Sequence, residues 1–291
     1  MCGFAGYAGE REYDTSVIRK MTDKIRHRGP DSQDAFIEGK VGLGFVRLSI
    51  IDLEGGSQPM FNEDKNLVLI FNGELYNFQD IRKELVEAGH VFTTHTDSEI
   101  LLHGYEEWGK EGLLGRLRGM FAFVIFDRTK KTLFGARDHF GIKPFYYYHK
   151  DGTFLFGSEI KSFLAHPDFQ KELFEEKLPD FMTFGCIPGA ETFFRNVYKL
   201  LPGHYFTYEE GKLTVSTYWE PTFDINENQT IESVADKLDG VLEDSIDKHI
   251  IADVPVCSFL SSGVDSSYVA YELKDKVDLT TFTIDFVEQK Y

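Results

Sequence analysis

The part of the sequence between Gly119 and Gly157 constrains the fold most, because it contains short strand-like runs separated by polar turns. These runs are Phe121–Phe126, Leu133–Ala136, Phe145–Tyr148 and Thr153–Gly157. The turn Lys150-Asp151-Gly152 between the last two is typical of a hairpin. Strands joined by hairpins in sequence order predict antiparallel sheets, unlike the alternation of strands and helices that builds a parallel sheet.

The residues before Gly119 carry both strand and helix patterns. We expect strands at residues 2–8, Ala35–Glu38, Val41–Ser49 and Asn66–Phe71, and helices over Val17–Ile25, Phe78–Glu87 and from Asp97 through Tyr105. Asp14 or Thr15 can cap the first of these helices, whose apolar residues fall on one face.

The pattern changes after Glu220–Gln229, a segment poor in apolar residues that we predict to be a linker between two domains. Beyond it we expect a βαβ unit, formed by a helix over Ile231–Ile251, a buried strand over Val254–Leu260, a helix over Tyr268–Leu273 and a strand over Leu279–Ile284. The loop Ser261-Ser262-Gly263-Val264-Asp265-Ser266-Ser267 opens the second helix. Such a loop can bind an anion, although small polar residues also serve as plain helix caps.

Composition excludes several classes of protein. The net charge of −17 argues against nucleic acid and anionic membrane surfaces as partners, since both need a basic surface. The sequence shows neither a secretion signal nor a membrane-spanning run. The three cysteines, Cys2, Cys186 and Cys257, are too few and too far apart for a disulfide framework or a zinc site. We therefore expect a cytoplasmic protein with reduced thiols and no metal ligand set.

Cys2 directly follows the initiator methionine. If Met1 is removed, one residue carries both a thiol and a free α-amine, which is a nucleophile with its own general base. The alternative is a small apolar residue that happens to stand second in the chain.

Four more segments have both a functional and a structural interpretation. Arg47 lies in an apolar, strand-like run and needs a carboxylate partner, either from the protein or from a ligand. Asp97 can be a helix N-cap, and Asn72-Gly73 after a strand is either a tight turn or an oxyanion site. The basic loop Arg26–Asp31 can be a solvated helix terminus. The single histidines His27, His95 and His139 receive no role.

Together these motifs resemble the glutamine-dependent asparagine synthetases. The resemblance rests on Met1-Cys2-Gly3, Arg26–Asp31, Arg47-Leu48-Ser49, Asn72–Asn77, Asp97, Arg137–Pro144 and Ser261–Ser267, which occur in the family's order. It implies that residues 2–219 form a class II glutamine amidotransferase domain, an α+β N-terminal-nucleophile hydrolase built as a four-layer αββα sandwich. It also implies that residues 230–291 are the beginning of an α/β ATP-pyrophosphatase domain, cut short in a truncated gene product or a shortened expression product.

The resemblance also implies a role for each site residue. Cys2 is the nucleophile, and its α-amine serves as base and later as acid. Asn72 and Gly73 form the oxyanion hole. Arg47 holds the α-carboxylate of glutamine and Asp97 its α-ammonium, while Glu74 either anchors the turn or helps to bind glutamine.

The loop Ser261–Ser267 is similar to the family's pyrophosphate loop. Ser262 stands where glycine is usual, which costs on the order of 1 kcal/mol if that residue needs a positive φ.

The function implied is hydrolysis of glutamine to glutamate and ammonia through a Cys2 thioester, without a cofactor. In the full-length protein the ammonia would serve an ATP- and Mg-dependent amidation of aspartate to asparagine. Alternatives are amidation of another carboxylate, a hexosamine or purine amidotransferase, which lacks the loop Ser261–Ser267, and a remnant domain without activity. A homodimer is compatible with each.

Overall fold

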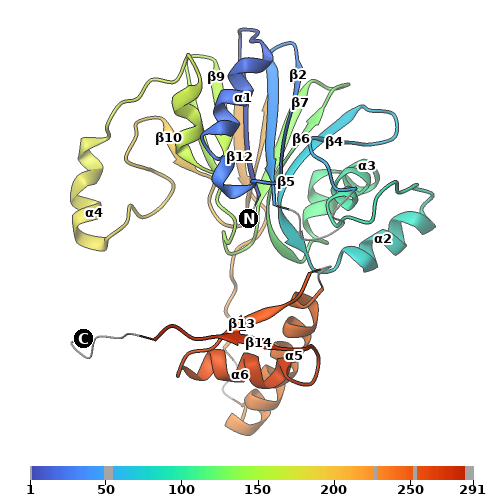
Figure 1. Ribbon diagram of the computed structural model, residues 1–291. Coiled ribbons are helices and arrows are strands. Elements are labelled where there is room, and N and C mark those ends of the chain that lie inside the picture. The colour runs from blue at the N-terminus through green and yellow to red at the C-terminus, as the bar shows by residue number, and fades with distance from the viewer. Residues whose placement is uncertain (1, 49–54, 226–227, 252–253, 286–291) are drawn as a thin grey trace. The chain divides into compact units, whose positions relative to one another are not determined.

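The computed structural model describes residues 2–48, 55–225, 228–251 and 254–285. Contacts divide the chain into two compact units, Met1–Pro221 and Thr222–Tyr291 (Figure 1). Among the described helices, none combines the length and the apolar character that crossing a bilayer would require.

The first unit contains two antiparallel sheets of six strands each. One sheet has the order β10-β8-β9-β1-β3-β2, formed by β1 (Gly3–Ala8), β2 (Ser32–Glu38), β3 (Val41–Arg47), β8 (Tyr146–Lys150), β9 (Thr153–Gly157) and β10 (Val197–Lys199). The other has the order β12-β11-β7-β6-β5-β4, formed by β4 (Met60–Phe61), β5 (Leu67–Leu75), β6 (Gly119–Asp127), β7 (Thr132–Arg137), β11 (His204–Glu209) and β12 (Lys212–Thr217). The antiparallel pairing predicted from the hairpins is confirmed.

The two sheets face each other across an apolar core. Phe4 and Phe156 from one sheet pack with Ile70 and Val124 from the other, and all four side chains are fully buried. Helix α1 (Thr15–Asp23) covers the outer face of the first sheet, because Ile18 and Met21 pack on Ala5, Tyr7 and their neighbours.

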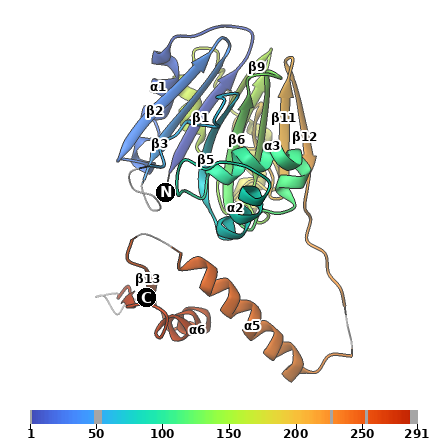
Figure 2. The ribbon, with the colours of Figure 1, turned by 90° about the vertical axis from the view of Figure 1, so that its right-hand side faces the viewer.

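Helices α2 (Phe78–Glu87) and α3 (Glu99–Leu114) lie on the outer side of the second sheet (Figure 2). The four layers are therefore helix, sheet, sheet and helix, as the predicted αββα sandwich requires. A further short helix, α4 (Leu178–Phe184), lies between β9 and β10 in the sequence.

Local signals explain most of the element boundaries. Asp14 caps α1 by accepting a 2.7 Å hydrogen bond from Ser16 N, and α2 has the bounds that its apolar pattern predicts. The predicted end of β5 at Phe71 is wrong, because Asn72 and Gly73 remain paired with Ala122 and Phe121 of β6. The tight-turn interpretation of Asn72-Gly73 is therefore excluded.

The predicted strand Val41–Ser49 ends at Arg47 in the structure, and Ser49 lies outside the described residues. Helix α3 is interrupted at Gly109, whose φ of 68° and ψ of −170° are not helical. Its N-cap position is Ser98, so Asp97 precedes the helix by one further residue.

The second unit contains the predicted βαβ unit. It is formed by α5 (Ile231–His249), β13 (Cys257–Phe259), α6 (Val264–Leu273) and β14 (Thr280–Phe282), and β13 pairs with β14 in parallel. The prediction of a buried strand at 254–260 is wrong for β13, since Phe259 is 76% exposed. β14 is exposed along its whole length as well.

Candidate active site

A cavity of about 160 Å³ lies in the first unit, at the ends of β1, β3 and β5. Every residue predicted for glutamine hydrolysis lines it, namely Cys2, Arg47, Asn72, Gly73, Glu74 and Asp97. The remaining lining residues are Leu48, Gly56, Gln58, Phe71, Thr96, Ser98, Met120 and Lys143. The sheet topology explains this convergence, because β1 pairs with β3 while the facing sheet supplies β5.

Hydrogen bonds hold both the side chain and the main chain of Cys2. Its Sγ lies 3.3 Å from Leu48 O and accepts a hydrogen bond of 3.4 Å from Leu48 N. Arg28 Nε donates a 2.9 Å hydrogen bond to Cys2 O, and Arg28 Nη1 contacts Glu159 Oε1 at 3.1 Å. Arg28 of the basic loop therefore holds the main chain of Cys2 and is not a solvated helix terminus.

The surroundings of the Cys2 thiol raise its pKa above the ordinary value. Burial is the largest influence and raises its pKa, and the charge of Glu74 acts in the same direction. The Leu48 hydrogen bond and the charge of Arg47 lower it without reversing the shift. A thiol of this kind needs a base that removes its proton as it attacks.

Asn72 lines the same cavity and carries a buried amide donor. The residue is 1% exposed, and its Nδ2 has no hydrogen-bond partner among the described residues. Buried amide donors are nearly always paired, so an unpaired one near a thiol is suited to stabilising an oxyanion. The neighbouring Gly73 permits close packing, because a Cβ there would lie 2.3 Å from Met120 O.

Two carboxylates, those of the half-buried Glu74 and the buried Asp97, also line the cavity. Asp97 is 6% exposed, and its Oδ2 accepts a 2.9 Å hydrogen bond from Leu75 N. Burial raises the pKa of Asp97 despite that bond. Burial and the charge of Asp97 raise the pKa of Glu74, and the Lys143 ammonium only partly offsets them. The pair favours a cationic group between them, and Asp97 is not a plain helix cap.

Arg47 completes the set of charged groups. It is 8% exposed at the end of β3, and its guanidinium lies against the main chain of Gly56. A Cβ on Gly56 would lie 2.5 Å from Arg47 Nη2 and 2.8 Å from Thr96 Cγ2. The glycine thus leaves room for arginine beside the cavity.

The segment Arg137–Pro144 presents Lys143 to the cavity. The carboxylate of Asp138 accepts hydrogen bonds from the backbone N–H groups of Ile142 and Lys143, both at 2.9 Å. Arg137 donates 2.7 Å hydrogen bonds to Lys143 O and Gly141 O. Burial lowers the pKa of Lys143, and the charges of Glu74 and Cys2 offset this shift only in part. The sequence analysis included Lys143 in a motif but assigned it no role.

Gln58 is a second residue that sequence reasoning missed. Its side chain hydrogen-bonds both backbone groups of Phe71, with Oε1 accepting from Phe71 N at 2.6 Å and Nε2 donating to Phe71 O at 3.2 Å. Gln58 therefore aligns the strand just before Asn72. A lone glutamine in a loop carries no sequence signal for this contact.

The loop Ser261–Ser267 lies in the second unit and starts α6. Ser261 and Ser266 are linked by a 2.9 Å hydrogen bond between their hydroxyls, and Ser261 Oγ accepts from Gly263 N at 3.1 Å. Ser262 is not among the residues with positive φ, so the expected strain is absent. Serine hydroxyls and backbone N–H groups at a helix N-terminus are donors that fit a phosphate group.

Comparison with known families agrees with this geometry. Residues 1–219 match the family described as glutamine amidotransferase domain. The chain belongs to the glutamine amidotransferase family. Residues 237–291 match the family described as asparagine synthase, which confirms the resemblance drawn from the motifs.

The relatives of this amidotransferase include several bacterial proteins. Asparagine synthetase (glutamine-hydrolyzing) 1 of Bacillus subtilis is 40% identical over 299 residues, which cover 100% of this chain and 47% of that protein. Asparagine synthetase (glutamine-hydrolyzing) 3 of the same organism is 36% identical over 301 residues, with coverage of 99% and 48%. The amidase chyE of Penicillium rubens is 34% identical over 293 residues, with coverage of 94% and 43%. The chain thus spans about half the length of these relatives.

A solved structure supports the fold. Glutamine phosphoribosylpyrophosphate amidotransferase from B. subtilis superposes with a TM-score of 0.55 at 17% identity, covering 100% of this chain and 68% of that chain. At this identity the likeness concerns the αββα architecture alone.

Proposed function

We propose that the first unit hydrolyses glutamine to glutamate and ammonia with Cys2 as nucleophile. The observation that carries the proposal is the buried Nδ2 donor of Asn72, which has no hydrogen-bond partner among the described residues and belongs to a residue that lines the same cavity as Cys2. A thiol beside such a donor suits acyl transfer through a tetrahedral intermediate.

The charges around the cavity match an amino-acid substrate. Arg47 would bind the α-carboxylate of glutamine, and Asp97 with Glu74 its α-ammonium. Each charge-assisted contact of this kind contributes about 1.5–3 kcal/mol. The raised pKa values of the two acids support this assignment, since a bound ammonium would favour their ionised forms. The charges would select glutamine over a simple amide.

The chemical steps follow from a processed N-terminus. With Met1 removed, the α-amine of Cys2 takes the thiol proton as sulfur attacks the side-chain amide carbon. Asn72 and Gly73 stabilise the oxyanion, and the amine returns the proton to the leaving nitrogen, so ammonia departs and a thioester remains. Water then attacks the thioester, loses a proton to the amine, and releases glutamate and the thiol.

For the whole protein we propose ATP-dependent amidation of aspartate to asparagine, since the two Bacillus subtilis relatives are named asparagine synthetase. We assign residues 2–219 to the glutaminase domain, 220–229 to a linker and 230–291 to part of an ATP-pyrophosphatase domain. Ser261–Ser267 would bind the pyrophosphate of ATP through hydroxyl and backbone donors, and magnesium would accompany the nucleotide. Reduced cysteines and the acidic charge support a cytoplasmic enzyme, and a homodimer stays a prediction.

The test measures ammonia released from glutamine together with the intact mass of the protein. We expect ammonia only from protein that lacks Met1, and none from Cys2→Ser. A glutamine-analogue electrophile should label Cys2 and leave Cys186 and Cys257 free. Labelling of either other cysteine, or full activity with Met1 retained, would contradict the proposal and favour a remnant without this chemistry.

A further inference from the structure

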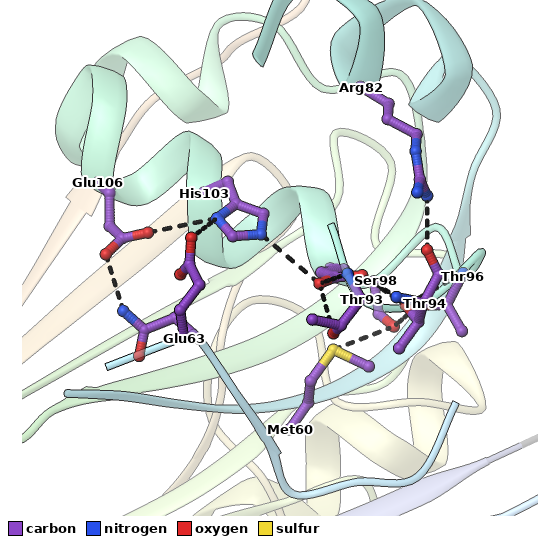
Figure 3. Close-up of polar contacts among 11 residues, drawn as sticks. Met60, Glu63, Arg82, Thr93, Thr94, Thr96, Ser98, His103 and Glu106 are labelled. Atoms are coloured by element: carbon purple, nitrogen blue, oxygen red, sulfur yellow. Dashed lines mark hydrogen bonds and ion pairs between the residues drawn. The ribbon is translucent and has the colours of Figure 1, made fainter. Parts of the chain in front are cut away.

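His103 lies at the centre of an acidic cluster on the outer side of the second sheet. It is 1% exposed in the first half of α3, and neither ring nitrogen has a hydrogen-bond partner among the described residues. Carboxylates approach both nitrogens at ion-pair distance, and Figure 3 shows Glu63 and Glu106 on the side of Nδ1. A buried imidazole without a hydrogen bond calls for a ligand, because such groups are almost always paired.

The two ring nitrogens of His103 face different carboxylates. Nδ1 lies 3.4 Å from Glu106 Oε2 and 3.8 Å from Glu63 Oε1. Nε2 lies 3.6 Å from Glu99 Oε1. Glu99 is itself fixed, since its carboxylate accepts 2.8 Å hydrogen bonds from the backbone N–H groups of Thr93 and Thr94. One nitrogen therefore faces an anchored carboxylate, and the other faces the cluster.

A second histidine joins the side of Glu63. His90 follows α2, and its ring centroid lies 5.1 Å from that of His103. One ligand atom each from Glu63, His90 and His103 can be chosen so that all three lie within 4.8 Å of one another. Ligand atoms of a tetrahedral zinc ion lie roughly 3.3–3.5 Å apart, given bonds of about 2.0–2.2 Å. Because the side chain of Glu63 is 44% exposed, a small rotation can close the difference.

The negative charge around His90 and His103 favours a cation that carries more than one positive charge. Four carboxylates, those of Glu63, Glu99, Glu106 and Glu107, lie within 3.8 Å of His90 or His103. These carboxylates make the surroundings of both imidazoles negative.

We propose that Glu63, His90 and His103 bind one transition-metal cation, with Zn²⁺ as the ion that the donors fit best. Two imidazoles and a carboxylate suit zinc, whereas magnesium and calcium prefer oxygen donors alone. Glu99 orients His103 from the side opposite the metal, an arrangement common in zinc sites. Water or Glu106 would take the fourth position.

The metal would connect three segments of the chain, one of which leads to Asp97 in the cavity. Its ligands come from the turn after β4, from the end of α2 and from α3. Asp97 lies between His90 and His103 in the sequence, two residues before Glu99, and lines the cavity. Zinc would therefore stabilise the segment that carries Asp97, without taking part in the chemistry.

The rival interpretation is a metal-free ion-pair cluster around an imidazolium. Isothermal titration of the chelator-treated chain with Zn²⁺ in a buffer that does not bind metal separates the two. We expect one equivalent bound and a higher Tm with zinc. Glu63→Gln and His90→Gln should each weaken zinc binding at least tenfold and abolish the Tm shift. Both residues are less buried than His103, so these variants are expected to fold.

Two control variants locate the binding. Glu111→Gln lies on an exposed turn of α3 beyond Gly109 and should bind zinc like the parent chain. The Cys2 thiol and α-amine could themselves bind zinc, so Cys2→Ser is the second control. It should retain full zinc binding. The proposal is overturned if no zinc binds, if Glu63→Gln and His90→Gln bind it like the parent chain, or if Cys2→Ser abolishes binding.

Discussion

Asn72 is the residue whose substitution best separates the oxyanion hole from the nucleophile. Asn72→Ala removes the buried Nδ2 donor but leaves the Cys2 thiol and the Gly73 main chain in place. Loss of one oxyanion donor typically lowers kcat by about 10²–10³. We expect residual glutaminase turnover in Asn72→Ala, slowed labelling by a glutamine-analogue electrophile, and neither in Cys2→Ser. Wild-type kcat in Asn72→Ala would exclude Asn72 as an oxyanion donor.

The carboxylates of Glu74 and Asp97 predict a pH dependence of glutamine binding. Both pKa values are raised by burial, so the acids take up protons at a higher pH than ordinary carboxyls. Only the ionised forms attract the α-ammonium, so affinity should increase as pH rises through the raised pKa values. The Kd of Cys2→Ser for glutamine, measured by titration calorimetry across pH, tests this without turnover.

Glu74→Gln in the same Cys2→Ser background is the matched variant for that experiment. Removing the Glu74 charge relieves its repulsion of Asp97, so the transition in Kd should move to lower pH. A profile that is flat, or one that Glu74→Gln leaves in place, would mean that the two acids do not bind the ammonium.

The site residues divide sharply in how far sequence could predict them. Cys2, Arg47, Asn72 and Asp97 stand in distinctive motifs, and the cavity brings them together. The residues that hold these side chains and their main chains in place could not be predicted from sequence. Arg28 contacts Cys2 O across 26 positions, and nothing in the local sequence encodes a contact made by tertiary packing.

His103 shows a related limit. Its neighbours Glu99, Glu106 and Glu107 are spaced for one helix face, which sequence could have indicated. His90 and Glu63 reach it only through the fold.

At the scale of elements, prediction succeeded where a pattern was long and local. The apolar period gave α2 its bounds, and the hairpins gave the antiparallel sheets. β5 runs on through Asn72-Gly73 because pairing with β6 outweighs the turn propensity of that dipeptide. β13 looked buried from its composition, but burial depends on a covering layer and not on the strand itself.

Gly29 directly follows the short 3-10 helix Arg26–Arg28 and packs against the backbone of β3. A Cβ at Gly29 would lie 2.3 Å from Val46 C and 2.4 Å from Arg47 N, both backbone atoms. Gly29→Ala should therefore displace Arg28 from Cys2 O, lower the free energy of unfolding by about 1–3 kcal/mol and reduce glutaminase activity. Urea unfolding and ammonia release measure the two effects.

Gly115→Ala is the control for Gly29→Ala. Gly115 ends α3 with a φ of −66°, and the nearest atom to an added Cβ is Glu111 O at 3.4 Å. The stability and activity of Gly115→Ala should stay close to those of the parent chain. Equal effects of both substitutions would show that the contact of Gly29 with β3 is unimportant.

At the scale of the whole molecule, the two units differ in how much core they contain. Among the described residues of Thr222–Tyr291, only Ile246 and Leu273 are buried apolar side chains, whereas the first unit has two apolar clusters. Since apolar burial is the main stabilising contribution, the second unit should unfold first.

Two spectroscopic signals can separate the unfolding of the units. Both tryptophans, Trp108 and Trp219, belong to the first unit, so their fluorescence reports on that unit alone. Far-UV circular dichroism also reports on α5 and α6 of the second unit. We expect part of the helical signal to be lost at lower urea concentration than the change in fluorescence. Coincident transitions for the two signals would mean that the units unfold together, and that the small core of the second unit does not limit its stability.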